Sequence, residues 1–291
     1  MRLVTVQTAD GQQGGVVTGD GSVASLRHWG FAAVEELIAA GEGAWSHVEE
    51  ESTGAAGHWP ADVALVSPVT RPPRNMFCIG LNYVSHHDEG ERASSSMPET
   101  PVVFTKPWTT LNAPGGDIVL DRKATEKADW EAELAVVIGT GGVNIAEADA
   151  MSHVFGYTLA NDVSARDLQL ANGPSSQWLK GKSLDGFCPL GPAILTPASV
   201  PDLAELHMVL TVNGTVKQDF LVGEMYHPIP KLISYLSLGM ALLPGDVILT
   251  GTAAGVGVWR EPPEFLVDGD VVEITCPPFG ALRNRVVERS S

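Results

Sequence analysis

Short runs of β-branched and apolar residues, each bounded by Gly, Pro or Asp, recur along most of this 291-residue chain and constrain its fold more than any other feature. These runs are NMFCIGLN (75–82), PVVFTK (101–106), DIVL (117–120), ELAVVIG (133–139), HVFGYTLAND (153–162), GPAILT (191–196), LHMVLTVNGTVKQ (206–218), DVILTG (246–251) and VVEITC (271–276). The Asn-Gly pair within VLTVNGTVKQD predicts a hairpin. Helical patterns are few, near 145–152 and 228–240. Many strands with few helices predict a strand-rich α+β fold, a mixed β roll or barrel and not a doubly wound sheet.

The first 70 residues differ from the rest and are predicted to form a small N-terminal α+β domain. RLVTVQ (2–7) and GGVVTGDGSVASL (14–26) read as short strands, and FAAVEELIAAGE (31–42) has helical spacing that stops at Gly41. The polar, Gly-rich stretch 41–59 is expected to be a connection. The prolines of PVTRPPRN then mark a boundary, so residues 71–291 form the second predicted domain.

Composition narrows the range of partners. The formal net charge is −17, which disfavours nucleic acid and anionic membranes, so an anionic substrate needs local positive charge from a metal or from Lys and Arg. Three separated cysteines, Cys78, Cys188 and Cys276, form neither a CxxC pair nor a zinc pattern. The N-terminus lacks the apolar core of a signal peptide, and no apolar run reaches the roughly 18 residues of a membrane span. A soluble cytoplasmic protein is expected.

Paired carboxylates stand at the start of the apolar run ADWEAELAVVIG. In a strand, Glu131 and Glu133 point the same way, with Asp129 in line behind them. Such carboxylates repel each other unless water screens them, one is protonated, or a cation lies between them. Asp162 follows another apolar strand in YTLANDVSARDLQ. Three hard oxygen ligands with no nearby Cys suit Mg²⁺, Mn²⁺ or Ca²⁺, although a solvated strand end is the simpler interpretation for the pair alone.

Residues from about 74 to 287 resemble the fumarylacetoacetate hydrolase (FAH) family. The matching motifs stand in the family order: IGLNYVSHHDE, PVVFTKP, DWEAELAVVIG, GYTLANDVSARDLQ, LKGKSLDGFCPLGP, LTVNG, PGDVILTGTAAGVG and FLVDGDVVEI. Each motif alone is weak, but their joint order is specific. The resemblance implies a mixed β roll, in agreement with the strand-rich pattern, and it implies a homodimer.

The resemblance also implies roles for individual residues. It matches Glu131, Glu133 and Asp162 to metal ligands, His86 and Glu89 to a pair that activates water or moves protons, Lys182 to a catalytic position that holds anionic oxygens, and Arg166, Gln169 and Thr252 to substrate-binding positions. Two departures stand out. Ala253 replaces the Pro that commonly follows Gly-Thr in the family, and Asp121 stands where many relatives have Pro.

Simpler interpretations exist for several of these residues. His86 and Glu89 have the i,i+3 spacing of a surface helix pair. Lys182 lies in GKS, but a phosphate loop would need Gly where Ser176 stands. Arg166 can pair with Asp167 or Asp162. The stretches DEGERASSSMPET and ANGPSSQWLKGK are expected to be loops near the site, the first like a lid.

The sequence favours a divalent-metal-dependent hydrolase that cleaves a C–C bond in a small anionic 2-oxo acid or 1,3-dicarbonyl, such as an acylpyruvate or a fumarylacetoacetate-like substrate. In that scheme His86, oriented by Glu89, deprotonates water, while Lys182, Arg166 and Gln169 stabilise negative charge. The alternative is an isomerase or decarboxylase of hydroxymuconate-type or oxaloacetate-like acids in aromatic catabolism. A catalytically silent metal-binding protein is the non-enzymatic alternative.

Overall fold

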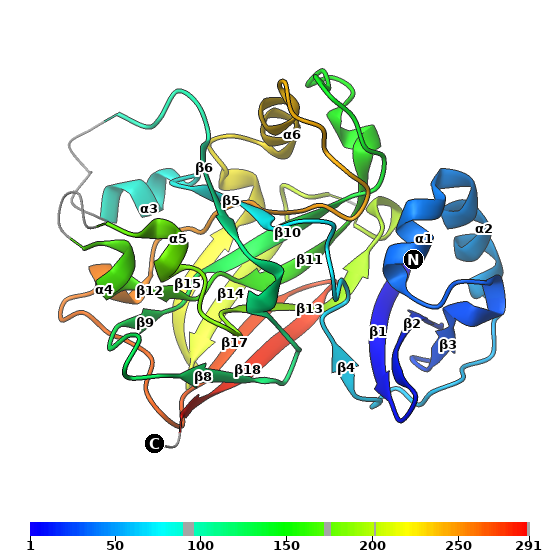
Figure 1. Cartoon of the computed structure of the whole chain (residues 1–291), viewed down its shortest axis with the longest axis horizontal. Coiled ribbons are helices and arrows are strands. Elements are labelled where there is room, and N and C mark those ends of the chain that lie inside the picture. The colour runs from blue at the N-terminus through cyan, green and yellow to red at the C-terminus, as the bar shows by residue number, and fades with distance from the viewer. Residues whose placement is uncertain (90–95, 172–175, 201, 290–291) are drawn as a thin grey trace.

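The computed structural model describes residues 1–89, 96–171, 176–200 and 202–289 (Figure 1). The strands are β1 (Arg2–Thr8), β2 (Gly11–Val17), β3 (Val23–Ser25), β4 (Leu65–Val66), β5 (Met76–Gly80), β6 (Val102–Lys106), β7 (Leu111–Asn112), β8 (Asp117–Leu120), β9 (Ala128–Asp129), β10 (Ala132–Ile138), β11 (Val154–Asn161), β12 (Ser164–Ala165), β13 (Cys188–Leu195), β14 (His207–Val212), β15 (Thr215–Leu221), β16 (Val247–Leu249), β17 (Val271–Cys276) and β18 (Gly280–Glu288). The helices are α1 (Val34–Ala40), α2 (Glu42–Ser52), α3 (Val84–Glu89), α4 (Arg166–Gln169), α5 (Trp178–Gly181) and α6 (Ile229–Ser237). Short 3₁₀ segments are η1 (Leu26–Trp29), η2 (Trp108–Thr110), η3 (Ala150–His153), η5 (Pro197–Ser199), η6 (Val222–Glu224) and η7 (Gly257–Trp259).

Within the described residues, the strands form two main sheets and one short pair. The larger sheet has 11 strands, with the path β3-β2-β1-β13-β11-β10-β16-β5-β6 and with β4 and β7 attached to β1 and β13. The smaller sheet has the order β15-β14-β17-β18-β8, and β9 pairs with β12. Most neighbours are antiparallel, but β16–β5, β13–β7 and β18–β8 are parallel. The predicted strand-rich mixed α+β fold is confirmed.

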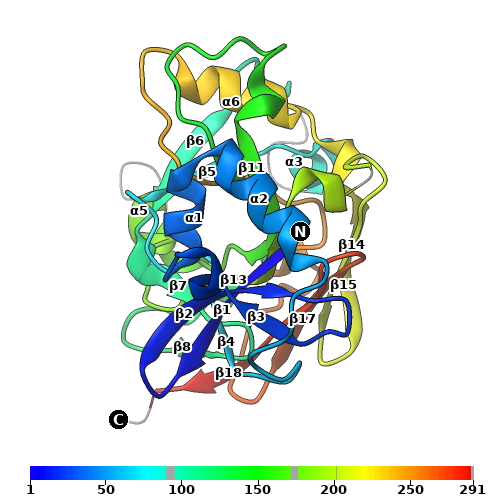
Figure 2. The same ribbon diagram turned by 90° about the vertical axis from the view of Figure 1, so that its right-hand side faces the viewer.

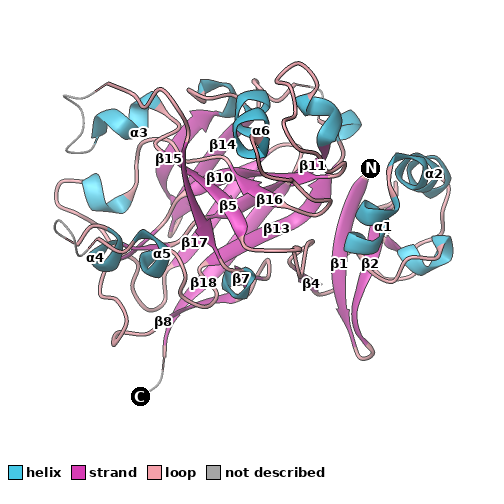
Figure 3. Cartoon of the chain, turned by 45° about the horizontal axis from the view of Figure 1, so that its top comes forward, coloured by secondary structure: helices cyan, strands magenta, loops and turns pink. Residues whose placement is uncertain are grey.

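Strand β10 explains how the layers hold together. Every residue of β10 is buried, so it lacks the alternation of a strand with one face in water. Its Leu134 and Val136 pack in the core shared with the smaller sheet, whereas Ala135 and Val137 pack in a second core. The helices lie around these central strands (Figure 3). Glu131 and Glu133 belong to the same face as Ala135 and Val137, so the carboxylates lie at one end of an apolar strand face.

The N-terminal segment is attached to the large sheet. β1 pairs with β13 in antiparallel register, with Leu3 opposite Ile194, and α1 and α2 lie beside β1 and β2 (Figure 2). Leu37 and Ile38 of α1 are buried in the second core. α1 ends as predicted at Gly41, whose φ of 85° suits glycine. The domain boundary near residue 70 stays a prediction.

Some expected elements differ from those observed. The stretch 41–59 was expected to be a connection, but most of it forms α2, because Trp45 packs edge-on against Phe155 and donates a 2.8 Å hydrogen bond to the carbonyl of Leu37 at the end of α1. The helix expected near 145–152 is confined to the short η3, whereas that expected near 228–240 is present as α6. β18 was missed, since its exposed face carries polar residues.

The remaining local expectations concern turns and loops. The Asn-Gly hairpin is confirmed: β14 and β15 are joined by Asn213 and Gly214, with φ values of 52° and 77°. The second expected loop contains α5, which carries Trp178. Residues 90–95 of the lid-like stretch DEGERASSSMPET (88–100) lie outside the described residues, as do residues 172–175 of the second loop.

Candidate active site

A cavity of about 320 Å³ opens where α3, α4, α5 and η7 meet the ends of β5 and β10. It is lined by Ile79, Gly80, Leu81, His86, His87, Phe104, Glu131, Glu133, Arg166, Gln169, Leu170, Trp178, Lys182, Thr252, Val258 and Trp259. Two further residues singled out from the sequence, Glu89 and Asp162, contact lining residues directly. The fold therefore brings together cavity-lining residues that lie up to 180 positions apart, the separation of Ile79 and Trp259.

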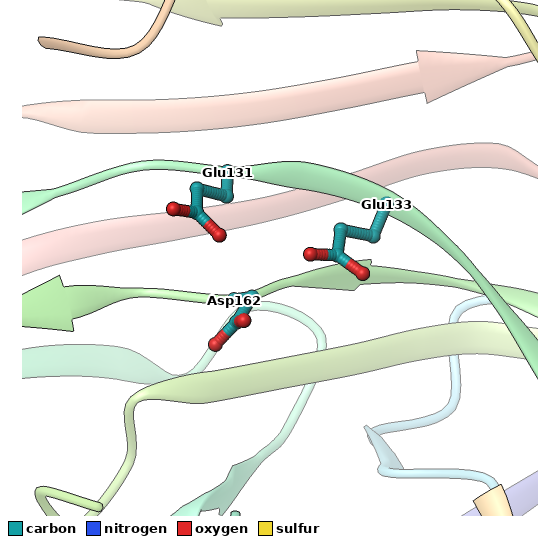
Figure 4. Close-up of side chains that lie close together, drawn as sticks. All are labelled: Glu131, Glu133 and Asp162. Carbon is teal, nitrogen blue, oxygen red and sulfur yellow. The ribbon is translucent and has the colours of Figure 1, made fainter. Parts of the chain in front are cut away.

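Three carboxylates form the acidic part of the site. One oxygen from each of Glu131, Glu133 and Asp162 lies within 4.8 Å of the others, and Figure 4 shows the three side chains converging. All three residues are buried. Antiparallel pairing of β10 with β11 accounts for this convergence, because Ala132 lies opposite Asn161 and so places Asp162 beside the two glutamates.

Lysines approach these carboxylates from two sides. The Nζ atom of Lys182 lies 2.7 Å from Glu131 and 2.8 Å from Asp162. The Nζ atom of Lys106, fully buried, lies 2.8 Å from the other oxygen of Asp162 and donates to the carbonyl of Val163. The site thus contains lysines, each ion-paired with its carboxylates, and the anionic substrate stays a prediction. Lys106 was missed, although the quoted motif PVVFTKP contains it.

Arg166 belongs to the same charge network. Its Nε atom donates to Asp129 and its Nη1 atom lies 2.7 Å from Glu131, so the suggested pairing with Asp167 or Asp162 is wrong. Asp129 also does not stand in line with the carboxylates: it ends β9, before the chain turns into β10, and holds Arg166 instead. Nη1 of Arg166 also donates to Gln169.

A histidine and a glutamate form the group suited to proton transfer. The Nδ1 atom of His86 lies 2.6 Å from Oε1 of Glu89, as their i,i+3 spacing on α3 allows. The second oxygen of Glu89 accepts a hydrogen bond from the backbone N–H of Gly255. The pair is therefore fixed to the turn after β16, and His86 lines the cavity. Its neighbour His87 lines the cavity too and contacts Asp88.

Thr252 contacts the protein as well as the cavity. Its hydroxyl donates to the carbonyl of Ala132 and accepts from the side chain of Gln218, both at 2.8 Å. The hydroxyl proton is therefore committed to the start of β10. Thr252 can offer a ligand only an acceptor, which makes its predicted substrate contact secondary to its role in holding β10.

Comparison with known proteins agrees with this geometry. The family model for the C-terminal domain of fumarylacetoacetate (FAA) hydrolase matches residues 75–287. The chain belongs to the fumarylacetoacetate hydrolase family. Like the tautomerase and isomerase relatives described next, it is an enzyme.

Relatives within the FAH family include two oxaloacetate tautomerases. The chain is 40% identical over 242 residues to YisK of Bacillus subtilis, covering 83% of this chain and 79% of YisK. It is 44% identical over 227 residues to the human mitochondrial FAHD2A, covering 78% of this chain and 70% of that protein. A solved structure of 5-carboxymethyl-2-hydroxymuconate delta-isomerase from Mycobacterium smegmatis is 34% identical over the whole of both chains, with a TM-score of 0.77.

The acidic triad of this FAH-family enzyme is chemically suited to a divalent cation. Burial, and then the charges of Asp162 and Glu131, raise the pKa of Glu133 well above its ordinary value. Oδ1 of Asp162, despite its ion pair with Lys106, accepts no hydrogen bond of good geometry from the described residues. A hard divalent ion would use the free lone pairs of these buried oxygens and would offset the repulsion that raises the pKa of Glu133.

Aromatic residues also line the cavity and were not singled out from the sequence. Trp178 packs edge-on against Phe104, with ring centroids 5.5 Å apart, and Trp259 lines the cavity from η7. Isolated aromatic residues in loops give no periodic signal, so only the folded chain shows that they line one cavity. In the described part of the chain, no helix is long and apolar enough to cross a bilayer.

Proposed function

We propose that this enzyme is a metal-dependent isomerase that interconverts the keto and enol forms of a small oxaloacetate-like 2-oxo acid. The observation that carries the proposal is the position of His86: Glu89 orients it, and it lines one cavity with Glu131, Glu133, Lys182 and Arg166. That arrangement joins a proton-transfer group to donors for a developing negative charge. Two relatives are oxaloacetate tautomerases and a third is a hydroxymuconate isomerase, all of which catalyse isomerisations.

The cation is proposed to be Mg²⁺, with Mn²⁺ or Ca²⁺ as alternatives. Glu131, Glu133 and Asp162 would hold it. When bound, such an ion supplies Lewis-acid stabilisation of negative charge on a substrate oxygen. Lys182 and Arg166 add fixed positive charge at the same wall, and Gln169 supports the guanidinium. These groups would give a strongly acidic protein a local site that attracts a small anion.

The proton step can be assigned to His86. With Nδ1–H donated to Glu89, the neutral ring keeps Nε2 as a proton acceptor. Nε2 takes a proton from the carbon beside the oxo group, the electron pair of that C–H bond forms the C=C bond, and the π pair of the C=O bond moves to the oxygen to give the enolate. The proton carried on Nε2 is then transferred to that oxygen, so the enol forms without water or loss of a fragment. The reverse step follows the same path.

Hydrolysis, which the sequence favoured, is now the second candidate. It would need His86 to deprotonate a water molecule, and it would divide the substrate into two acids. The relatives fit the isomerase alternative better, because their printed activities retain all atoms of the substrate. Decarboxylation is a third possible outcome on oxaloacetate, and a silent metal-binding protein is a fourth.

The test is the ultraviolet absorbance of the enol form of oxaloacetate. The purified enzyme with Mg²⁺ is expected to accelerate keto–enol equilibration, and EDTA is expected to abolish the acceleration. His86→Gln should lower kcat about 10²–10⁴-fold, the usual contribution of a positioned proton-transfer group. The matched control is His207→Gln, which breaks a His–carboxylate pair with Asp219 on the exposed β14–β15 hairpin and should leave kcat unchanged.

Products distinguish the candidates. Release of CO₂ with pyruvate from oxaloacetate would replace the tautomerase proposal with decarboxylation. Recovery of pyruvate from a short acylpyruvate, with no effect on oxaloacetate, would establish hydrolysis. Magnesium-dependent stabilisation with no turnover of any of these acids would favour the silent metal-binding protein.

A homodimer and a cytoplasmic location remain proposals, and the partner is proposed to be a small anionic 2-oxo acid rather than nucleic acid or membrane. The net charge of −17 supports the exclusion of polyanions. Light scattering of the purified protein would give the oligomeric state directly, and a mass equal to one chain would reject the dimer.

A further inference from the structure

The guanidinium of Arg166 has one terminal nitrogen to spare. Its Nε atom donates to Asp129 at 2.8 Å, and its Nη1 atom serves Gln169 at 2.8 Å and Glu131 at 2.7 Å. Nη2 is buried and has no hydrogen-bond partner among the described residues. Because a guanidinium is rigid and planar, fixing Nε and Nη1 also fixes the direction of Nη2. Arg166 lines the cavity, and Nη2 is the one guanidinium nitrogen that the described residues leave without a hydrogen bond.

Asp129 is the residue that joins this guanidinium to a second wall of the cavity. It is fully buried, and its Oδ2 accepts from Arg166 and from the backbone N–H of Val258 at 3.0 Å. Its Oδ1 accepts from the N–H of Gly257 at 2.7 Å and from that of Trp130 at 2.8 Å. One carboxylate thus accepts hydrogen bonds from four donors: one in the residue before Glu131, one in α4 and two in η7. Asp129 does not itself line the cavity.

The backbone of η7 is shaped to accept this carboxylate. A Cβ atom added to Gly257 would lie 2.7 Å from Oδ1 of Asp129 and 2.1 Å from the carbonyl of Glu264. Only glycine permits so close an approach. The next residues, Val258 and Trp259, line the cavity. A shift of Asp129 would therefore displace both Arg166 and the cavity-lining residues Val258 and Trp259.

We propose that Asp129 is a positioning residue: it holds the guanidinium of Arg166 and the Gly257–Trp259 turn so that Nη2 of Arg166 faces a carboxylate of the substrate. The inference deepens the proposed function, on which it rests for the substrate being an anionic 2-oxo acid. A substrate carboxylate meeting Nη2 would form a charge-assisted hydrogen bond in a buried site. Asp129 would then act on substrate affinity through Arg166, with no contact of its own.

The first test is Asp129→Asn, which keeps the shape of the side chain but replaces one acceptor oxygen with an NH2 group. That NH2 group would face either the donor of Arg166 or the backbone N–H groups of η7. The KM for oxaloacetate is expected to rise about 10–100-fold, with kcat changed less than about threefold. In an Arg166→Ala background the same substitution should change KM less than about twofold, because the group it positions is gone. If Asp129 had only a structural role, Asp129→Asn would change KM by the same factor in the wild-type and in the Arg166→Ala background.

The matched control is Asp246→Asn. Asp246 is also a buried aspartate paired with an arginine, Arg74, and also accepts from a backbone N–H, that of Leu243, but it does not line the cavity. Its loss should lower thermal stability and leave KM unchanged. If Asp129→Asn does not fold, Asp129→Ser, which leaves room for a water molecule, takes its place.

A binding assay separates this inference from the proposed reaction. Oxalate, titrated in the presence of Mg²⁺ and followed by the fluorescence of Trp178 and Trp259, measures occupancy of the cavity without turnover. A 10-fold or greater weakening of oxalate binding in Asp129→Asn, even if oxaloacetate proves not to be the substrate, would support the positioning role. Unchanged oxalate binding in the folded variant, or no oxalate binding by the wild type, would overturn it.

Discussion

Two glutamates that stand two residues apart show how strongly the folded environment sets a side chain's chemistry. Burial raises the pKa of Glu131, but the charges of Lys182 and Arg166 more than offset it and lower that pKa to about 2. Burial also raises the pKa of Glu133, and there the charges of Asp162 and Glu131 raise it further. The two neighbouring glutamates are therefore shifted in opposite directions, and Glu133 is the harder of the two to ionise in the metal-free site.

This difference predicts a pH dependence of the metal-free protein. Because the folded pKa of Glu133 is raised, the unfolded chain releases this proton first, at its ordinary value of 4.5. The stability that Glu133 contributes is thus complete below 4.5 and is lost as the pH rises toward the folded pKa. In EDTA, the free energy of unfolding of Glu133→Gln, relative to that of the wild type, should rise by up to about 1.4 kcal/mol for each pH unit across that window.

Urea titrations of the wild type and of Glu133→Gln at pH values from about 5 to 8 measure this difference. The opposite shift of Glu131 cancels in the comparison, since both proteins carry it. Saturating Mg²⁺ should stabilise the wild type more than the variant. A difference that stays flat with pH would show that Glu133 is ionised in the folded protein.

At the scale of elements, the turn after β16 shows how contacts replace a missing proline. Ala253 stands where the family commonly has Pro, and it is buried, with its carbonyl accepting a 2.9 Å hydrogen bond from Gln218. Two residues later, the N–H of Gly255 donates to Glu89. Gln218 of β15 and Glu89 of α3 thus both hold this turn by hydrogen bonds. The turn also keeps Glu89 in place beside His86.

Gly255→Ala is expected to break this turn. Gly255 has a φ of 104°, and an added Cβ would lie 2.0 Å from the carbonyl of Lys217. We expect a loss of about 2–4 kcal/mol in the free energy of unfolding and at least a tenfold loss of kcat as Glu89 shifts. The control is Gly11→Ala, which has the same φ of 104° with nothing within 4 Å of the added Cβ.

Gly11→Ala should cost only the backbone strain, about 1 kcal/mol, and should leave kcat unchanged. Chemical denaturation and steady-state kinetics of both variants make the comparison. Equal losses of stability would mean that the turn yields to the methyl group and does not hold Glu89.

At the scale of the whole molecule, the two apolar cores meet across β10. The second core combines Leu37 and Val48 from the N-terminal helices with Val137 and Ile194 from the large sheet. The N-terminal segment is also tied to the next part of the chain by Glu35, whose carboxylate accepts from the backbone N–H of Thr70. Neither part buries all of its apolar surface without the other.

This shared core predicts cooperative unfolding. Calorimetry of the full chain should give one transition, and a chain reduced to residues 71–291 should be less stable by more than about 3 kcal/mol, because burying one large aliphatic side chain is worth about 1.5–3 kcal/mol and several are exposed. Two separate transitions, or an unchanged midpoint in the shortened chain, would contradict the prediction and would establish residues 1–70 as an independent domain.

The sequence by itself determined the elements whose signals are local: the strands with β-branched runs, the Asn213-Gly214 hairpin, and the stop of α1 at Gly41. It also indicated the acidic triad, because alternation along a strand is a local rule and Asp162 follows its neighbouring strand. The roles of His86 and Lys182 came from the family motifs, and those roles stay proposals.

Only the tertiary structure decided what depends on distant contacts. α2 forms because Trp45 finds Phe155 and the end of α1, and nothing in its own polar sequence requires it. Lys106 and Asp129 belong to the site because folding buries their charges beside Asp162 and Arg166. A charge on a strand looks the same in sequence whether water or a buried partner will surround it, and long-range packing alone makes that choice.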